Sequence, residues 1–296
     1  MPNLYGAIEA GGTKFVCAVG SGPDDIIETR IPTTTPQSTF AQVTEFFSPY
    51  RDALTAIGIG SFGPLDRNPD SPNYGFITST TKAGWLDTDF VGAMTQHFNV
   101  PVVFETDVNA AAVGEGHWGA ARGNSDFIYL TVGTGIGGGV VSGGNLIHGL
   151  IHTELGHIFL PKHPRDKFAG QCPYHANLCL EGLASGPAIH ARWGKPAQQL
   201  EPEHPAWDMQ AYYLACALNT FICSYSPQKI ILGGGVMQQA HLLEMVKHQT
   251  LSLHNGYIGH RILANNIDNV IVAPGLKAKS GILGALYLAK QHGKQK

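Results

Sequence analysis

Short apolar runs, many of them ended by glycine, alternate along the chain with longer stretches of helical apolar period. Runs of four to eight apolar residues bounded by turn residues predict buried strands, whereas the longer periodic stretches predict helices. The first part of the chain therefore predicts three consecutive strands at 4–8, 15–19 and 26–31. A helix at 36–51 and a fourth strand at 56–61 follow.

The middle of the chain predicts a loop-rich stretch at 66–84, a helix at 88–98, a short strand at 102–105 and a second helix that begins at Asp107. A similar order then returns, with strands at 127–132 and 139–142, a turn at 143–145, a helix at 210–224, a strand at 229–232 and a last helix at 277–291. This repeated alternation predicts a duplicated α/β fold with a mixed sheet in each half.

Composition narrows the class of protein. The chain has 296 residues, of which 43% are hydrophobic and 14% charged, so we expect a globular protein of one large or two moderate domains. A net charge of −3 without a long basic run argues against a nucleic-acid partner. No signal peptide, no apolar run of membrane-spanning length and an odd number of cysteines favour a cytoplasmic protein without a membrane partner.

Two glycine-rich segments, 9–14 and 131–139, each follow a predicted strand. A turn of small residues lets backbone N–H groups approach a phosphate, and the hydroxyls of Thr13 and Thr134 can bond its oxygens. Lys14 adds a cation at the first turn. The two segments together favour nucleotide binding over the alternative, in which both are simple hairpin turns that use glycine for a positive φ.

The second segment formally matches G-x-G-x-x-G over 133–138. A dinucleotide-binding fingerprint requires these glycines to open a helix, but 139–142 predicts a returning strand. We therefore expect a hairpin whose tip approaches phosphate. Neither segment contains G-x-x-x-x-G-K-[ST], so a P-loop is excluded.

Asp107 precedes an alanine-rich run and begins a predicted helix. One interpretation is an N-cap, which accepts hydrogen bonds from the first turn of the helix. The other is a catalytic base that deprotonates an alcohol while a phosphoryl group arrives, a reaction that needs mainly positioning and charge neutralisation. Glu9, beside the first glycine turn, is a candidate to hold Mg²⁺ directly or through water.

Among the residues between Glu154 and Glu181, two histidines and two cysteines follow the pattern His-x14-Cys-x2-His-x3-Cys. This spacing, in a loop rich in proline and glycine, predicts tetrahedral zinc ligation, and four protein ligands make the metal structural. The alternative is a loop with scattered thiols. The predicted ligands are His157, Cys172, His175 and Cys179, with His152 and His163 as substitutes.

In their order along the chain, these motifs resemble the ROK family of sugar kinases, and the resemblance covers nearly the whole sequence. It is carried by 9–14, 106–109, 133–139, 154–157, the zinc loop that ends at Glu181, and 230–236. Within the family, the segments at 9–15, 61–64 and 81–85 look like the bacterial fructokinase branch. Glucokinase-type members usually have Asp where this chain has Glu9, Asn where it has Thr106, and a zinc loop of the form Cys-x-Cys-x4-Cys.

The resemblance implies an actin-like ATPase (ribonuclease H-like) duplicated fold, whose two lobes form a central cleft for ATP and sugar. The expected small lobe is 1–118, with the helix at 277–296 packing back on it. The expected large lobe is 119–276 and includes the zinc loop at 157–179. The expected assembly is a homodimer, although the residue pattern itself leaves the oligomeric state open.

The resemblance also implies residue roles. Asp107 is the expected base, and His157 would give one nitrogen to the sugar and the other to zinc, which fixes the ring's tautomer and direction. The implied sugar contacts are Gly63, Thr81, Asp107, Glu154, His157 and Glu181. The implied nucleotide contacts are Gly12, Thr13, Lys14, Thr134, Gly135, Pro187, Gly234, Gly235, Val236 and Met237.

The expected function is ATP-dependent phosphorylation of the 6-hydroxyl of fructose, with ATP, Mg²⁺ and structural Zn²⁺. Kinases for other hexoses such as mannose or glucose are the alternatives, together with a sugar-responsive ROK regulator. A regulator would carry a helix-turn-helix segment before the first glycine turn, but the first strand begins near residue 4. Asp107 and both turns argue against a non-catalytic sensor, and four zinc ligands argue against a zinc hydrolase.

Overall fold

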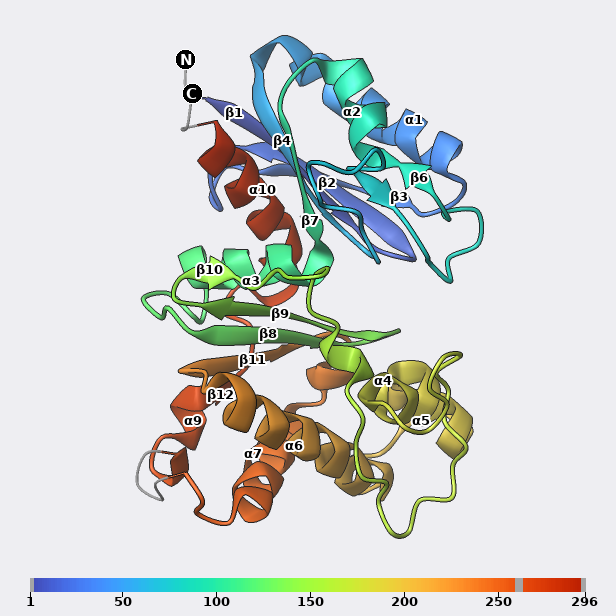
Figure 1. Cartoon of the computed structure of the whole chain (residues 1–296), viewed down its shortest axis with the longest axis vertical. Helices are drawn as coiled ribbons and strands as arrows, with labels where there is room; N and C mark the ends of the chain where they lie inside the picture. Colours follow the sequence, from blue (N-terminus) through green and yellow to red (C-terminus); the bar gives the residue numbers. More distant parts are fainter. Residues whose placement is uncertain (1–2, 259–262, 294–296) are drawn as a thin grey trace. The chain divides into compact units, whose positions relative to one another are not determined.

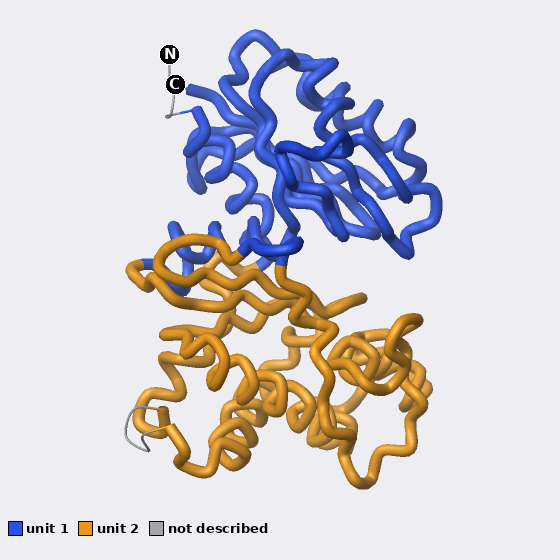
Figure 2. Tube along the Cα trace, in the orientation of Figure 1, with its two compact units in different colours: residues 1–122, 148–152, 278–296 blue, residues 123–147, 153–277 orange. Residues whose placement is uncertain are grey.

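The computed structural model describes residues 3–258 and 263–293, and shows two compact units (Figure 2). The first unit consists of the described residues up to 122, of 148–152 and of those from 278 onward; the second consists of 123–147 and the described part of 153–277. Residues 294–296, part of the expected last helical segment, lie outside the described residues.

The first unit is built on a five-stranded mixed sheet of order β3-β2-β1-β4-β7. β1 pairs antiparallel with β2, and β2 with β3, because short connections join them, whereas β4 is parallel to both β1 and β7. The strands are β1 (Leu4–Ala10), β2 (Lys14–Gly20), β3 (Ile27–Pro32), β4 (Leu54–Ser61) and β7 (Val102–Thr106).

Helices cover both faces of this sheet (Figure 1). α1 (Pro36–Phe47) and α2 (Phe90–Phe98) pack over an aromatic core that includes Phe15 and Trp85. α3 (Asp107–Trp118) and α10 (Ser280–His292) pack against each other and against β4.

The close approach of α10 to the sheet requires a glycine in β4. A Cβ atom on Gly58 would lie 1.9 Å from the carbonyl oxygen of Ala285 in α10. Only glycine allows the two backbones to approach so closely, which anchors the chain's last helix on the first unit's sheet.

Two local expectations for the first unit differ from the structure. The helix expected at 36–51 ends as α-helix at Phe47 and continues as a 3-10 turn, Ser48–Ala53, because Pro49 has no N–H to extend the α pattern. The helix expected at 88–98 begins at Phe90. The two residues before it form β6 (Thr88–Asp89), which pairs with β5 (Phe76–Ile77), and Asp89 caps the helix through the amide of Gly92.

The second unit is built on a mixed sheet of order β10-β9-β8-β11-β12. β8 and β9 form an antiparallel hairpin, and β8 is parallel to β11. The mixed sheet predicted for each half of the chain is therefore confirmed. The strands are β8 (Phe127–Val132), β9 (Ile136–Ser142), β10 (Asn145–Leu146), β11 (Lys229–Gly233) and β12 (Ile271–Val272).

α6 (Ala206–Tyr225) and α7 (Ala240–His254) pack side by side on this sheet (Figure 1). Their apolar faces meet Leu130 and Leu232 from the central strands. Shorter elements complete the chain. They are η2 (Leu155–His157), α4 (Leu180–Ala184), α5 (Gly186–Trp193), η3 (Ala197–Gln199), η4 (Val236–Gln238), α9 (Ile267–Val270) and η5 (Lys277–Lys279). The last of them, η5, crosses from the second unit into the first.

Sequence analysis did not predict α4, α5, α7, α9 or β12. All five cysteines are free, and Cys216 and Cys223 lie on α6. Among residues 3–258 and 263–293, no helix has both the length and the apolar character that a bilayer span requires.

Candidate functional site

The first glycine turn connects β1 to β2 as a tight hairpin, which confirms the predicted geometry. Ala10 and Phe15 are the closing strand pair. The amide of Gly11 donates to the carbonyl oxygen of Lys14 over 3.0 Å, and the hydroxyl of Thr33 donates to the Gly11 carbonyl over 2.7 Å. The turn is therefore braced by the segment that follows β3 before any ligand binds.

The second glycine turn, residues 133–135, closes the β8–β9 hairpin. The amide of Gly133 donates to the carbonyl of Gly135 over 2.9 Å, and β9 rather than a helix follows the turn. The expectation of a hairpin in place of a dinucleotide-binding turn is thus confirmed.

The candidate nucleotide residues of the second unit lie close to this hairpin. The amide of Gly186, at the start of α5 beside Pro187, donates to the Gly133 carbonyl over 2.7 Å. Gly234, with φ of +92°, packs its Cα against the backbone of Val132 and turns the chain into η4. The hairpin tip, the start of α5 and 234–237 therefore meet at the carboxyl ends of the parallel strands β8 and β11, where open α/β sheets bind ligands.

Asp107 is the first residue of α3, but the N-cap interpretation of this residue is wrong. Thr106 is the N-cap, and its hydroxyl accepts a hydrogen bond from the amide of Asn109 over 3.1 Å. The Asp107 carboxylate accepts from the amide of Val108 over 2.9 Å. A carboxylate in the first turn of a helix interacts favourably with the helix dipole, which agrees with the place of Asp107 in α3.

Glu9 lies in β1 and reaches the beginning of α10. Its carboxyl group accepts a hydrogen bond from the amide of Ile282, and a Cβ atom on Gly281 would lie 2.6 Å from the Glu9 side chain. Burial, and next the negative charge of Asp107, raise the pKa of Glu9 to about 7, against a smaller opposing effect of Lys14. Two carboxyl groups that interact in this way suit a divalent cation such as Mg²⁺.

Replacing Glu9 by glutamine is expected to stabilise the protein relative to wild type as the pH rises from 5 to 8. The folded pKa of about 7 lies above the ordinary value of 4.5, so the folded state binds more protons between these pH values. The contribution of protonated Glu9 to the free energy of unfolding is fully present below pH 4.5. This contribution is lost as the pH rises through 7. Urea unfolding without Mg²⁺ should show a relative gain of about 2 kcal/mol for Glu9→Gln between pH 5 and pH 8.

Glu45→Gln is the matched control, because Glu45 is an exposed residue of α1 in the same unit. Its difference from wild type should change little over the same pH range. A Glu9→Gln difference that stays constant with pH would contradict the assigned pKa.

A buried charge cluster next to Asp107 was missed by sequence analysis. The side chain of Glu105, in β7, is 2% exposed. Its Oε2 lies 2.8 Å from the guanidinium of Arg67 and 2.9 Å from Nε2 of His148. Its Oε1 accepts from the side-chain amide of Asn109 over 2.9 Å. Burial acts to raise the pKa of Glu105, but hydrogen bonds from His148 and Asn109 and the charge of Arg67 together lower it below its usual value.

This cluster holds the residues on both sides of Asp107. The Oε1 atom of Glu105 also accepts from the amide of Thr106 over 2.9 Å, and Nε of Arg67 donates to the carbonyl of Phe104 over 3.0 Å. The signal in the sequence that could have revealed this charge cluster is a glutamate at the end of an apolar strand. Its partners, however, come from positions about 40 residues away in sequence on either side.

Replacing Glu105 by alanine is expected to cost about 2–4 kcal/mol of unfolding free energy, because Arg67, His148 and Asn109 lose a buried acceptor. Arg67→Ala should cost less, since three donors to Glu105 stay in place. Urea unfolding of both variants and the wild type measures the difference. A cost below about 1 kcal/mol for Glu105→Ala would show that the cluster contributes little.

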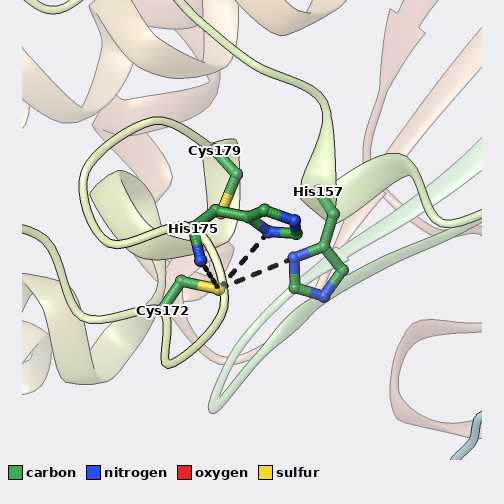
Figure 3. A group of neighbouring side chains, drawn as sticks. All are labelled: His157, Cys172, His175 and Cys179. Atoms are coloured by element: carbon green, nitrogen blue, oxygen red, sulfur yellow. Dashed lines mark hydrogen bonds between the residues drawn. The ribbon is translucent and has the colours of Figure 1, made fainter.

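The four predicted zinc ligands meet in one cluster of the second unit (Figure 3). Their donor atoms all lie within 4.8 Å of one another. Sγ of Cys172 lies 3.8 Å from Nδ1 of His157 and 3.7 Å from Nδ1 of His175. Tetrahedral zinc with ordinary bond lengths places sulfur and nitrogen ligands about 3.6 Å apart, so the spacing of the donors fits zinc.

Cys179 shows why this cluster suits a cation. Burial first, and then the neighbouring Cys172 thiol and the Glu181 carboxylate, raise the pKa of Cys179 to about 11. A bound zinc ion displaces such thiol protons. The two substitute ligands lie outside the cluster: the ring of His152 lies beside Gly63 in the first unit, and that of His163 packs against Tyr212.

The long span between His157 and Cys172 is anchored by Asp166. Its carboxylate is 2% exposed and accepts from the hydroxyl of Tyr213 over 2.6 Å and from the guanidinium of Arg192 over 3.1 Å. Arg192 also stacks on the ring of Phe168, 4.5 Å from its centroid. These contacts tie the loop to α5 and α6 independently of any metal.

The candidate sugar residues come from both units. In the first unit, Gly63 follows β4 and Thr81 is an exposed loop residue. In the second unit, the carbonyl of Glu154 accepts from the amide of His157 over 3.0 Å, so both residues belong to one turn. Nε2 of His157, the nitrogen directed away from Cys172, lies 4.0 Å from Oε1 of Glu181. The second unit thus brings three of the candidates together.

A model of the ROK family matches residues 5–292, and the chain therefore belongs to the ROK family. It is 45% identical over 288 residues to a fructokinase of Pediococcus pentosaceus, covering 97% of this chain and 98% of that protein. It is 44% identical over 297 residues to a fructokinase of Streptococcus mutans, covering 98% and 99%.

The fold agrees with solved structures of this family. The crystal structure of a ROK hexokinase from Thermus thermophilus superimposes with a TM-score of 0.77 at 28% identity, covering 99% of this chain and 100% of that one. The actin-like duplicated fold expected from the sequence is therefore confirmed.

Proposed function

We propose that this protein is a fructokinase that transfers the γ-phosphoryl group of ATP to the 6-hydroxyl of fructose. The observation that carries the proposal is the identity of about 45% to fructokinases over almost the full length of both chains. The glutamate at position 9, in the β1–β2 hairpin, agrees with the fructokinase-like motifs of the sequence.

In the proposed mechanism, Asp107 accepts the proton of the 6-hydroxyl as that oxygen attacks the γ-phosphorus. The hydrogen bond from the amide of Val108 holds the Asp107 carboxylate in place. The sugar is bound by Gly63, Thr81, Glu154, His157 and Glu181. The phosphates and adenosine are bound by Gly12, Thr13, Lys14, Thr134, Gly135, Pro187 and 234–237.

Mg²⁺ would neutralise charge on the phosphates, with Glu9 as its proposed protein ligand, directly or through water. We propose that His157, Cys172, His175 and Cys179 hold one structural Zn²⁺. Because Nδ1 of His157 faces Cys172, the metal would fix the ring so that Nε2 is the nitrogen presented to the sugar. The proposed small functional lobe consists of 1–118 together with 277–296, and the proposed large lobe is 119–276. We propose that two such chains form a homodimer.

A panel of hexoses with ATP and Mg²⁺ tests the proposed function. A coupled ADP assay measures kcat/KM for fructose, mannose and glucose. We expect fructose to exceed the other two by at least about tenfold, the discrimination that 1.4 kcal/mol of transition-state binding provides. A higher value for mannose or glucose would reassign the substrate. No turnover of any hexose would favour a sugar-responsive regulator. Light scattering of the purified protein tests the homodimer.

A further inference from the structure

The carboxylate of Glu181 makes a contact that binding a sugar does not require. Its Oε2 atom accepts a hydrogen bond from the backbone amide of Ile136 over 2.9 Å. Ile136 is the first residue of β9 and directly follows the glycine turn of the β8–β9 hairpin. The other oxygen, Oε1, is the one directed toward His157. The two oxygens of one carboxylate therefore serve two different parts of the site.

The hairpin is shaped to receive this carboxylate. A Cβ atom on Gly135 would lie 2.8 Å from Oε2 of Glu181, so a side chain at position 135 would collide with the carboxylate. A Cβ atom on Gly156 would lie 1.8 Å from the carbonyl oxygen of Ile136, which shows that the turn bearing His157 packs directly on the same residue. Two glycines thus allow backbone and carboxylate to close around Ile136.

Glu181 is itself held by the cysteine end of the zinc loop. Cys179 is the N-cap of α4, and its Sγ accepts a hydrogen bond from the amide of Gly182 over 3.4 Å. Glu181 lies in the first turn of that helix. A continuous set of contacts therefore runs from Cys179, through the beginning of α4 and the Glu181 carboxylate, to the amide of Ile136.

We propose that Glu181 is a positioning residue for the nucleotide, in addition to its proposed contact with the sugar. Its carboxylate holds the β8–β9 turn in the conformation that presents Thr134 and the neighbouring amides to the phosphates. The inference rests on the proposed function in that it takes this turn to bind phosphate. A residue that only contacts the sugar would leave nucleotide affinity unchanged when no sugar is present.

The test measures the Kd of a non-hydrolysable ATP analogue with Mg²⁺ by calorimetry, in the absence of sugar. Glu181→Ala is expected to weaken binding about tenfold, since it removes the hydrogen bond that holds the turn at Ile136. Glu181→Gln keeps an oxygen that can accept from Ile136 and should stay within about threefold of wild type. Both variants should raise the KM for the sugar. Glu203→Ala, an exposed glutamate of the same unit, is the control.

Amide hydrogen exchange of Ile136 gives a second readout that requires no activity. The wild type and Glu181→Gln should protect this amide, and Glu181→Ala should expose it. Zinc content of each variant shows whether the metal cluster is intact. If Glu181→Ala does not fold, hydrogen exchange of the Ile136 amide in the wild type and in Glu181→Gln still tests the proposal.

Three results would overturn the proposal: an unprotected Ile136 amide in the wild type, an unchanged nucleotide Kd for Glu181→Ala, or an equal loss for the alanine and glutamine variants. Failure of the proposed function has a different signature. In that case the wild type itself would bind no ATP analogue, or would phosphorylate no hexose in the panel.

Discussion

Replacing Asp107 by alanine is expected to lower the kcat for sugar phosphorylation by about 10³, the size of effect that a general base contributes. Asp107→Asn should lose nearly as much, because the amide keeps the shape of the side chain and can still bond the sugar but cannot accept its proton. The measurement is kcat and KM with saturating ATP and Mg²⁺ in the coupled assay. The nucleotide Kd should change little.

Two controls separate loss of chemistry from loss of structure. Asp52→Ala replaces an exposed aspartate of the first unit and should leave turnover unchanged. Unfolding curves show whether Asp107→Asn is folded, and this variant keeps Thr106, the N-cap of α3. Turnover of Asp107→Asn within about tenfold of wild type would reject the assignment of Asp107 as the base.

Replacing Cys172 by serine is expected to abolish zinc binding and to destabilise the second unit. Cys172 contacts both histidines of the cluster, so its loss leaves no tetrahedral set. A site that is saturated at about a thousand times its Kd loses about 4 kcal/mol of apparent stability when the metal can no longer bind. Metal analysis of freshly purified protein and thermal unfolding measure the two effects.

The matched control is Cys223→Ser, which changes an exposed thiol of the same unit outside the cluster. It should retain one zinc ion per chain and a normal melting temperature. Limited proteolysis should cut the 160–180 segment faster in Cys172→Ser, although the Asp166 anchor slows complete release. Wild-type protein that is purified without zinc, or a Cys172→Ser variant that keeps it, would contradict the zinc assignment.

The start of α3 shows what local sequence signals can and cannot predict. The helix start was predicted correctly, because polar capping residues before an alanine-rich run are a local signal. Sequence analysis nevertheless placed the alternative N-cap one residue too late. Thr106 and Asp107 are both good capping residues, and only the backbone conformation at 106 decides between them.

Features that depend on a few neighbouring residues could be predicted from the sequence alone. The two glycine hairpins are of this kind, because turn residues between apolar runs specify a returning strand. The zinc-type cluster was also predictable, since three of its ligands lie within eight residues and leave few ways to arrange themselves. The short helices α4 and α5 were not, because their few turns carry no clear apolar period.

Contacts between distant segments were decided only by the tertiary structure. The Glu105 cluster requires Arg67 and His148, and no local pattern indicates that a strand-end glutamate meets them. The same holds for the Glu181 bond to Ile136, which joins residues 45 positions apart. The sequence by itself determined which side chains have suitable chemistry and which short turns they occupy. Which of them meet depends on the packing of the whole chain, because burial and long-range pairing contribute more free energy than local preference.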